Sequence, residues 1–162
     1  MNNGTHITVR LDSQELVLHE TNGKQRVYPV STALNGPGER LNSECTPRGL
    51  HQVRIVIGQD CPPNAVFTGR RFTGEIYSQK LADSEPDRDW ILSRILWLTG
   101  CEQGFNRGGE CDSLRRYIYI HGTPDTEPVG TPRSHGCIRM RNHDVIDLAN
   151  RVTAGTPILI EA

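Results

Sequence analysis

The segment IHGTPDTEPVGTPRSHGCIRM, residues 120–140, carries most of the chemistry in this chain, and the fold assignment rests on it as well. It places His121, His135 and Cys137 in a stretch rich in glycine and proline. A nucleophilic cysteine needs a base that forms its thiolate, an accessible position and donors that hold a developing oxyanion. Gly136 allows a substrate carbonyl to approach Cys137 closely because it has no side chain. The segment therefore indicates a catalytic thiol at Cys137.

Two histidines are candidates for the base that serves this thiol. His135 is two residues from Cys137, so on an extended backbone the two side chains share a face. His121 ends a predicted strand and is distant in sequence, which suits a base on a rigid element opposite a loop nucleophile. The chemistry of the residues alone does not rank the two. The backbone N–H groups around His135, Gly136 and Cys137 are natural oxyanion donors.

The same segment resembles a known family signature. The block Ser134–Arg139 (SHGCIR), preceded by His121-Gly122, is similar to the motif of YkuD-type L,D-transpeptidases, in which a His and a gap precede a Ser/Thr-His-Gly-Cys block. Thr46–Gly49 (TPRG) resembles that family's Thr-Pro-x-Gly segment, and residues 144–160 resemble its closing helix, turn and strand. The likeness spans nearly the whole chain. It implies a mainly β (α+β) fold, a YkuD-like β-sandwich or barrel with two short helices, in which residues 1–162 form a single catalytic domain.

The resemblance also implies a role for each residue that matches the motif. Cys137 matches the nucleophile, and His121 matches the proton donor and acceptor. The carbonyl of Gly122 matches the group that orients the base. The backbone of His135, Gly136 and Cys137 matches the oxyanion region, which favours His121 over His135 as the base.

Three further residues are candidates for substrate binding, each with a structural alternative. Arg139 matches a position that is often Asn or Arg, and either binds a substrate carboxylate or makes a structural ion pair. Ser134 either contacts substrate or caps its own loop. Tyr119 shares the strand face of His121 by alternation, and either lines the pocket or packs in the core, which is the more common role. The gap between His121 and Ser134 is shorter than the family's usual spacing, so the acceptor side is expected to be shaped differently.

The family resemblance implies the reaction. Its members cleave the bond between the L-centre of a diamino acid, usually meso-diaminopimelate, and the terminal D-Ala of a peptidoglycan tetrapeptide or muropeptide stem. The thioester left on Cys137 then passes to an amine, giving a 3→3 cross-link, or to water, giving L,D-carboxypeptidase activity. The start MNNGTHITVRLD has no apolar leader segment, so we expect a cytoplasmic L,D-carboxypeptidase of peptidoglycan recycling. A periplasmic cross-linking L,D-transpeptidase is the alternative, favoured if a leader was removed. Carbapenems are expected to acylate Cys137.

Other functional classes are less consistent with the sequence. The residues His121, His135, Cys137 and His143 suggest a zinc site, but no Cys-x₂-Cys or His-Glu-x-x-His pair accompanies them, so we expect no metal and no cofactor. A non-catalytic peptidoglycan-binding module is a further alternative. A formal net charge of −1 and 6% aromatic residues do not favour nucleic-acid binding, and no apolar run is long enough for a membrane span.

The patterning predicts many short strands and two helices. Asn22-Gly23 is typical of a tight hairpin turn, and the spacing of apolar residues predicts a helix over 87–98 and another over 143–152, with Asn142 as its N-cap. The five cysteines are expected to be unpaired, and the glycine-rich loop 101–111 is a candidate lid over the site. Strands are predicted over 5–11, 14–20, 25–30, 52–57, around 67, 72–77, 116–121 and 156–160.

Overall fold

The computed structural model describes residues 4–162, which form a mainly β fold with two α-helices and one short 3-10 helix, η1 (Gly109–Cys111). The helices are α1 (Gln79–Ser84) and α2 (Asn142–Arg151). Neither helix in this part of the chain is long and apolar enough to cross a lipid bilayer. The strands are β1 (His6–Arg10), β2 (Glu15–His19), β3 (Gln25–Ser31), β4 (Gly49–Ile57), β5 (Ala65–Thr68), β6 (Arg71–Ile76), β7 (Ile91–Gly100), β8 (Tyr119–Thr123), β9 (Ile138–Arg141) and β10 (Pro157–Glu161).

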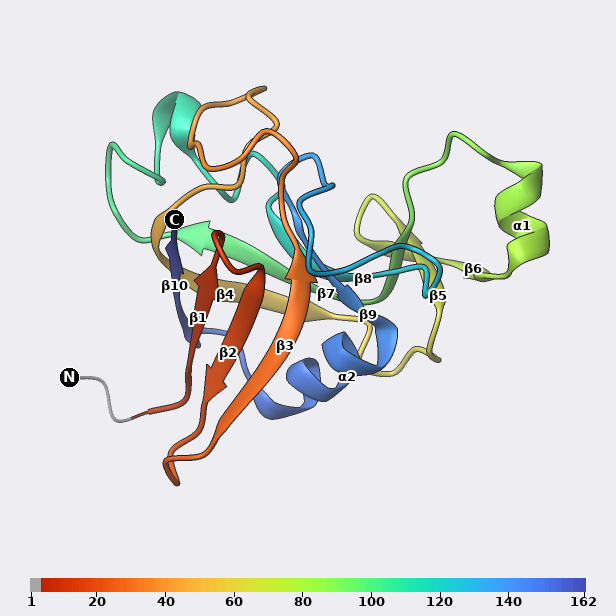
Figure 1. Cartoon of the computed structure of the whole chain (residues 1–162), viewed down its shortest axis with the longest axis horizontal. Helices are drawn as coiled ribbons and strands as arrows, with labels where there is room; N and C mark the ends of the chain where they lie inside the picture. Colours follow the sequence, from red (N-terminus) through yellow and green to blue (C-terminus); the bar gives the residue numbers. More distant parts are fainter. Residues whose placement is uncertain (1–3) are drawn as a thin grey trace.

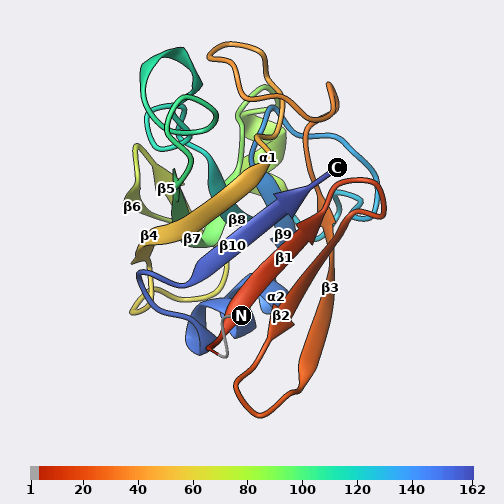
Figure 2. The same cartoon turned by 90° about the vertical axis from the view of Figure 1, so that its left-hand side faces the viewer.

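All of these strands belong to one sheet that closes on itself. The order is β4-β10-β1-β2-β3-β9-β8-β7-β5-β6, and β4 also pairs with β7. The first eight strands in this order, from β4 through β10 and β9 to β7, therefore form a closed barrel, and β5 and β6 lie outside it. Strands β4, β10, β1, β2 and β3 lie side by side on one face of the molecule (Figure 2). The β5–β6 hairpin and α1 extend outside the barrel, on the right in Figure 1. The predicted β-sandwich or barrel with two helices is therefore confirmed.

The core lies between the barrel strands and one face of α2. Strands with period-2 patterning turn alternate residues inward, as in β1, where Ile7 and Val9 are fully buried. Helix α2 presents Val145, Leu148 and Ala149, at the i, i+3, i+4 spacing of one helix face, to β7, β8 and β9. This packing fixes the strands that carry the candidate site.

Several local predictions are confirmed within one to three residues at the ends, because turn chemistry and alternation agreed. At the Asn22-Gly23 hairpin, Gly23 adopts a φ of 85°, which an L-residue rarely adopts, and its N–H donates to the carbonyl of Glu20. Strands β1 to β6 and β10 all fall on the predicted segments.

The predicted helix over 87–98 is wrong, because Ile91–Gly100 is strand β7. This strand pairs with β8 on one side and with β4 and β5 on the other, and it is buried on both faces. A doubly buried strand has apolar residues at nearly every position, so its spacing also satisfies a helical pattern. The second helix is instead α1, capped by Ser78, whose Oγ accepts a hydrogen bond from the Leu81 N–H at 3.1 Å.

Two further differences concern the elements around the site. Helix α2 begins at Asn142 itself, and the Asn142 side chain is not a cap: its Nδ2 donates to the Thr123 carbonyl at 2.8 Å. Strand β8 begins at Tyr119 rather than at residue 116, because the backbone turns at Tyr117, where φ is 57°. Strand β9 was not predicted, since four residues between two loops carry too little pattern.

Candidate active site

The parallel pairing of β8 with β9 brings the predicted nucleophile and base together. In its register His121 lies opposite Arg139, and Cys137 immediately precedes β9. Registered neighbours in a parallel pair direct their side chains to the same face, and residues two apart on one strand share a face. The side chains of Cys137, Arg139 and His121 therefore belong to one face of the β8–β9 pair. Cys137 and His121 are separated in sequence by a loop, but the pairing of β8 with β9 brings both to the same face of the sheet.

The burial and hydrogen bonding of His121 fit a neutral imidazole. Its side chain is buried, and Nδ1 donates to the carbonyl of Gly122 at 2.7 Å, which leaves Nε2 as the unprotonated nitrogen. Burial lowers the pKa of His121, and the bond to the Gly122 carbonyl opposes that shift. A Cβ at Gly122 would lie 2.5 Å from the carbonyl oxygen of Leu92, so only glycine fits there. The predicted orienting role of Gly122 agrees with this geometry.

Cys137 rests as a protonated thiol. Its Sγ donates to the carbonyl of Tyr117 at 3.4 Å and accepts the N–H of Tyr119 at 3.4 Å. Burial raises the pKa of Cys137 to about 11, and the bond from Tyr119 partly offsets this rise. Within residues 4–162 the thiol is hydrogen-bonded to backbone and not to His121. A reaction at Cys137 would therefore require the thiol to lose its proton as it attacks.

The loop before Cys137 is held at three points. Ser134 Oγ donates to the Cys137 carbonyl at 2.6 Å and accepts the Gly136 N–H at 3.2 Å. Thr46 Oγ1 donates to the Gly136 carbonyl at 2.9 Å. Ser134 is buried, so its hydroxyl shapes the loop and does not face substrate.

These bonds refine the predicted oxyanion donors. The N–H of Gly136 is already used by Ser134. The N–H groups of His135 and Cys137 have no hydrogen-bond partner in the described part of the chain. Those two groups are the ones that can hold an oxyanion, whereas Gly136 contributes its conformation, with a φ of 130° and the Cys45 carbonyl only 3.1 Å from an added Cβ.

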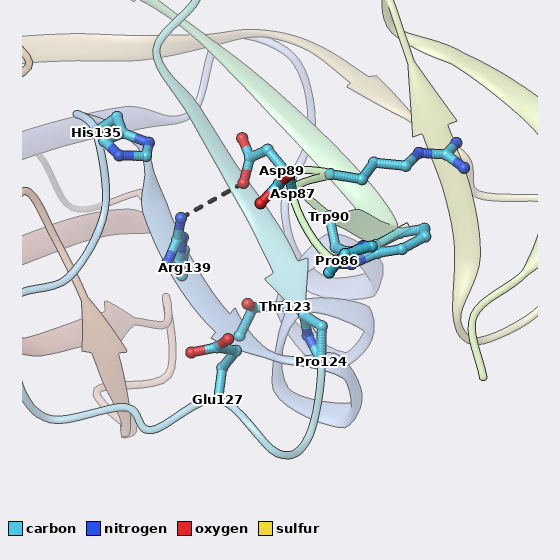
Figure 3. Close-up of a pocket in the computed structure, with 10 residues that line it drawn as sticks. Pro86, Asp87, Asp89, Trp90, Thr123, Pro124, Glu127, His135 and Arg139 are labelled. Atoms are coloured by element: carbon cyan, nitrogen blue, oxygen red, sulfur yellow. Dashed lines mark hydrogen bonds and ion pairs between the residues drawn. The ribbon is translucent and has the colours of Figure 1, made fainter. Parts of the chain in front are cut away.

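Two hollows meet at the exposed side chain of His135. The first, which we call the Arg139 hollow, has a volume of about 200 Å³. The second, the Tyr117 hollow, has a volume of about 300 Å³. The Arg139 hollow is lined by Pro86, Asp87, Arg88, Asp89, Trp90, Thr123, Pro124, Glu127, His135 and Arg139 (Figure 3). The Tyr117 hollow is lined by Leu41, Asn42, Glu44, Arg115, Arg116, Tyr117, Ile118 and His135.

Tyr119 packs in the core and is not part of either hollow. Its side chain is 5% exposed, its ring meets the edge of Trp97, and its hydroxyl accepts a hydrogen bond from Arg70 at 3.1 Å. The guanidinium of Arg70 also lies 4.9 Å from the ring centroids of Trp97 and Tyr117. Arg70 thus ties together the segment whose backbone holds the thiol.

Sequence reasoning missed three contributors to the site. Thr46 had a signal, the Thr-Pro-x-Gly resemblance, but not its role of holding the nucleophile loop. Arg116 donates to the Cys45 carbonyl at 2.7 Å and so fixes the backbone next to Thr46. Asp89 pairs with Arg139 at 3.4 Å across 50 positions of sequence, for which no local pattern exists.

Three further features named from the sequence are the histidines, the cysteines and the loop 101–111. No group of three or more metal-ligating side chains occurs in residues 4–162, and His143 lies on the exposed side of α2 beside Asp144. The five cysteines are all free thiols. No residue of the loop 101–111 lines either hollow; Asn106 donates to the carbonyls of Arg48 and Leu50 at 3.0 Å and anchors the loop to β4. Residues 86–90, and not the loop 101–111, line the Arg139 hollow.

Comparison with known proteins agrees with this architecture. Residues 4–160 match the family model described as the YkuD L,D-transpeptidase catalytic domain. The putative L,D-transpeptidase YkuD of Bacillus subtilis is 49% identical over 49 residues, which is 30% of each chain. The putative L,D-transpeptidase YqjB of the same organism is 47% identical over 45 residues, 28% of this chain and 26% of that protein. These matches span about a third or less of the relatives' length.

Solved structures share the fold at low sequence identity. An L,D-transpeptidase from Mycobacterium smegmatis superposes with a TM-score of 0.60 and 20% identity, covering 98% of this chain and 59% of the other. L,D-transpeptidase 3 from Mycobacterium tuberculosis, in complex with a faropenem-derived adduct, superposes with a TM-score of 0.61 and 16% identity, covering 98% and 60%. The family match runs from the first strand to the last and includes the nucleophile loop, and the chain therefore belongs to the YkuD family of L,D-transpeptidase catalytic domains.

Proposed function

We propose that this chain transfers the acyl group of a peptidoglycan tetrapeptide stem through a thioester on Cys137. The bond broken is the one between the L-centre of diaminopimelate and the terminal D-Ala. The observation that carries the proposal is the β8–β9 register, which sets the thiol and a buried neutral imidazole on one face of a rigid strand pair. Family membership supports the same chemistry.

The acylation step follows from the groups around Cys137. Nε2 of His121 takes the thiol proton as sulfur attacks the diaminopimelyl carbonyl. The carbonyl oxygen becomes an oxyanion, for which the N–H groups of His135 and Cys137 are free to donate. The tetrahedral intermediate collapses when the C–N bond breaks, and the imidazolium returns its proton to the departing D-Ala amine. A neutral thioester and a neutral imidazole remain.

For the acyl acceptor we propose an amine, the alternative to the hydrolysis that the sequence led us to expect. Its support is that two hollows share His135, so that one could hold the acylated stem and the other a second stem. The incoming amine gives a proton to His121 and takes the acyl group, which completes an L,D-transpeptidation. Hydrolysis by water, the L,D-carboxypeptidase reaction, competes at a thiol that is only half-buried.

The test is turnover of purified disaccharide-tetrapeptide, followed by mass spectrometry. We expect cross-linked dimers that have lost one D-Ala, with free tripeptide as the hydrolytic by-product. Cys137→Ala should abolish both products, and His143→Ala, an exposed change on α2, should leave them unchanged. Turnover that survives in Cys137→Ala would remove the thiol from the mechanism. If the wild-type protein instead bound peptidoglycan without turning it over, and Cys137→Ala bound equally well, a binding module would be the better description.

A second measurement addresses the thiol itself. Intact-mass analysis after incubation with a carbapenem should show one adduct, mapped to Cys137, as expected for a thiol that attacks strained amides. The adduct described for the M. tuberculosis relative supports this expectation. An unmodified protein after prolonged incubation, with the fold intact, would contradict it.

A further inference from the structure

The Arg139 hollow holds opposite charges on facing walls. Arg139 enters from β9, while carboxylates enter from the segment before β7 and from the loop after β8 (Figure 3). These carboxylates belong to Asp87, Asp89 and Glu127. The hollow has a volume of about 200 Å³ and most of its lining side chains are polar or charged. The hollow is therefore suited to a small, doubly charged group and not to a large apolar one.

Arg139 has unused hydrogen-bonding capacity in this hollow. Its side chain is only 14% exposed, yet its one hydrogen bond in residues 4–162 is the 3.4 Å contact from Nη2 to Asp89. A guanidinium has five N–H donors in a planar fork that matches a carboxylate with two parallel bonds. The other donors of Arg139 thus remain available to an anion that enters the hollow.

Asp89 is the opposite case, an anion that is open to solvent. Its side chain is 61% exposed, and its only ion pair in the described part of the chain is the long contact with Arg139. Asp89 also acts on the pKa of both His121 and Cys137, so its charge lies near the reacting groups. An ion pair this long, with Asp89 open to solvent, contributes little stability and exchanges partners at small cost.

We propose that the Arg139 hollow binds the zwitterionic head group of an α-amino acid, with its carboxylate on Arg139 and its ammonium on Asp89. One weak ion pair is then replaced by two. This inference rests on the proposed function, in whose substrate the D-centre of diaminopimelate is such a head group. A stem with lysine lacks the carboxylate, and a stem with amidated diaminopimelate lacks the anion, so both leave Arg139 without its partner.

The experiment pairs each variant with a substrate that lacks the matching group. We would measure kcat/KM for D-Ala release from four tetrapeptides, containing diaminopimelate, its side-chain amide, its side-chain N-acetyl derivative, or lysine. Wild-type protein should prefer diaminopimelate by roughly 10- to 100-fold, the range for losing one charge-assisted hydrogen-bond pair. Asp89→Asn should slow the diaminopimelate stem and spare the N-acetyl stem. Arg139→Gln should slow the diaminopimelate stem and spare the amide. Asp83→Asn, on the exposed surface of α1, is the matched control and should change nothing.

A second arm identifies which stem supplies the head group. With the N-acetyl donor held constant, transfer is measured to a D-amino acid and to the matching amine without its carboxylate. If Arg139→Gln abolishes the preference among donors, the hollow serves the donor stem. If it abolishes the preference among acceptors, the hollow serves the acceptor stem.

A binding measurement separates this inference from the proposed function. Calorimetry with Cys137→Ala protein and the diaminopimelate tripeptide requires no turnover. Binding at least 10-fold tighter than that of the lysine tripeptide, lost in the double variant with Asp89→Asn, would support the head-group site even if the wild-type enzyme were inactive on tetrapeptides. Equal affinity for the two tripeptides, or equal slowing of every stem by Asp89→Asn, would overturn it.

Discussion

Replacing Thr46 by valine should damage the site by releasing the loop that carries Cys137. Thr46 is fully buried, and its hydroxyl donates to the Gly136 carbonyl at 2.9 Å while it accepts the Ala33 N–H at 3.0 Å. Valine has nearly the shape of threonine but no hydroxyl, so the Gly136 carbonyl and the Ala33 N–H would both lose their hydrogen-bond partner. A buried group left without its hydrogen bond costs about 1–3 kcal/mol, so the two together should lower the free energy of unfolding by about 2–6 kcal/mol.

The assay is urea denaturation followed by circular dichroism, together with kcat/KM for D-Ala release. Thr46→Ser keeps the hydroxyl and should recover most of the lost stability and activity. Thr99→Val is the control, because Thr99 is half-buried on β7 and its side chain makes no hydrogen bond in residues 4–162. If Thr46→Val unfolded within about 0.5 kcal/mol of wild type, the range of neutral surface substitutions, the hydroxyl would not be what secures the loop.

Three further predictions test other parts of the site. Alkylation of Cys137 by iodoacetamide, mapped by peptide mass, should accelerate as pH rises towards its pKa of about 11, because only the thiolate reacts; a rate that levels off near pH 8 would show that the thiol is not desolvated. Gly122→Ala forces a Cβ to within 2.5 Å of the Leu92 carbonyl and should lower the free energy of unfolding by about 1–3 kcal/mol in urea denaturation, whereas an unchanged midpoint would mean that β8 shifts freely. Arg70→Ala removes the cation from the ring of Trp97 and should loosen the backbone around the thiol, which faster alkylation at pH 8 would reveal and an unaltered rate would refute.

The sequence was most informative where local chemistry and tertiary context agree. Asn22-Gly23 prescribes its turn whatever surrounds it, and half-buried strands such as β1 show their alternation directly. The motif around Cys137 was enough to identify the family, and the role of the thiol stays a prediction. The pairing of Cys137 with His121 on one sheet face was expected through resemblance, and the β8–β9 register supplies its physical basis.

The structure differs from the sequence predictions in segments whose conformation is decided by the elements packed around them. Strand β7 is buried on both faces, so Ile91–Gly100 lacks the polar positions that separate a strand from a helix. Strand β9 exists only because β8 and β3 flank it. The use of the Gly136 N–H by Ser134 depends on one turn of the loop, and the Asp89–Arg139 pair depends on how a distant segment returns to the barrel. No spacing rule encodes contacts of these kinds.

The closed barrel has a consequence for how this enzyme class varies. The chain leaves the barrel after β4 and re-enters it at β7, so residues 58–90, with β5, β6 and α1, form one contiguous excursion from it. That excursion supplies Asp89 to the Arg139 hollow, whereas His121 lies on β8 and Cys137 immediately precedes β9, two barrel strands that pair without it. Mutation, insertion or recombination within residues 58–90 can therefore change the lining of the hollow, while the β8–β9 pairing that positions His121 and Cys137 stays the same.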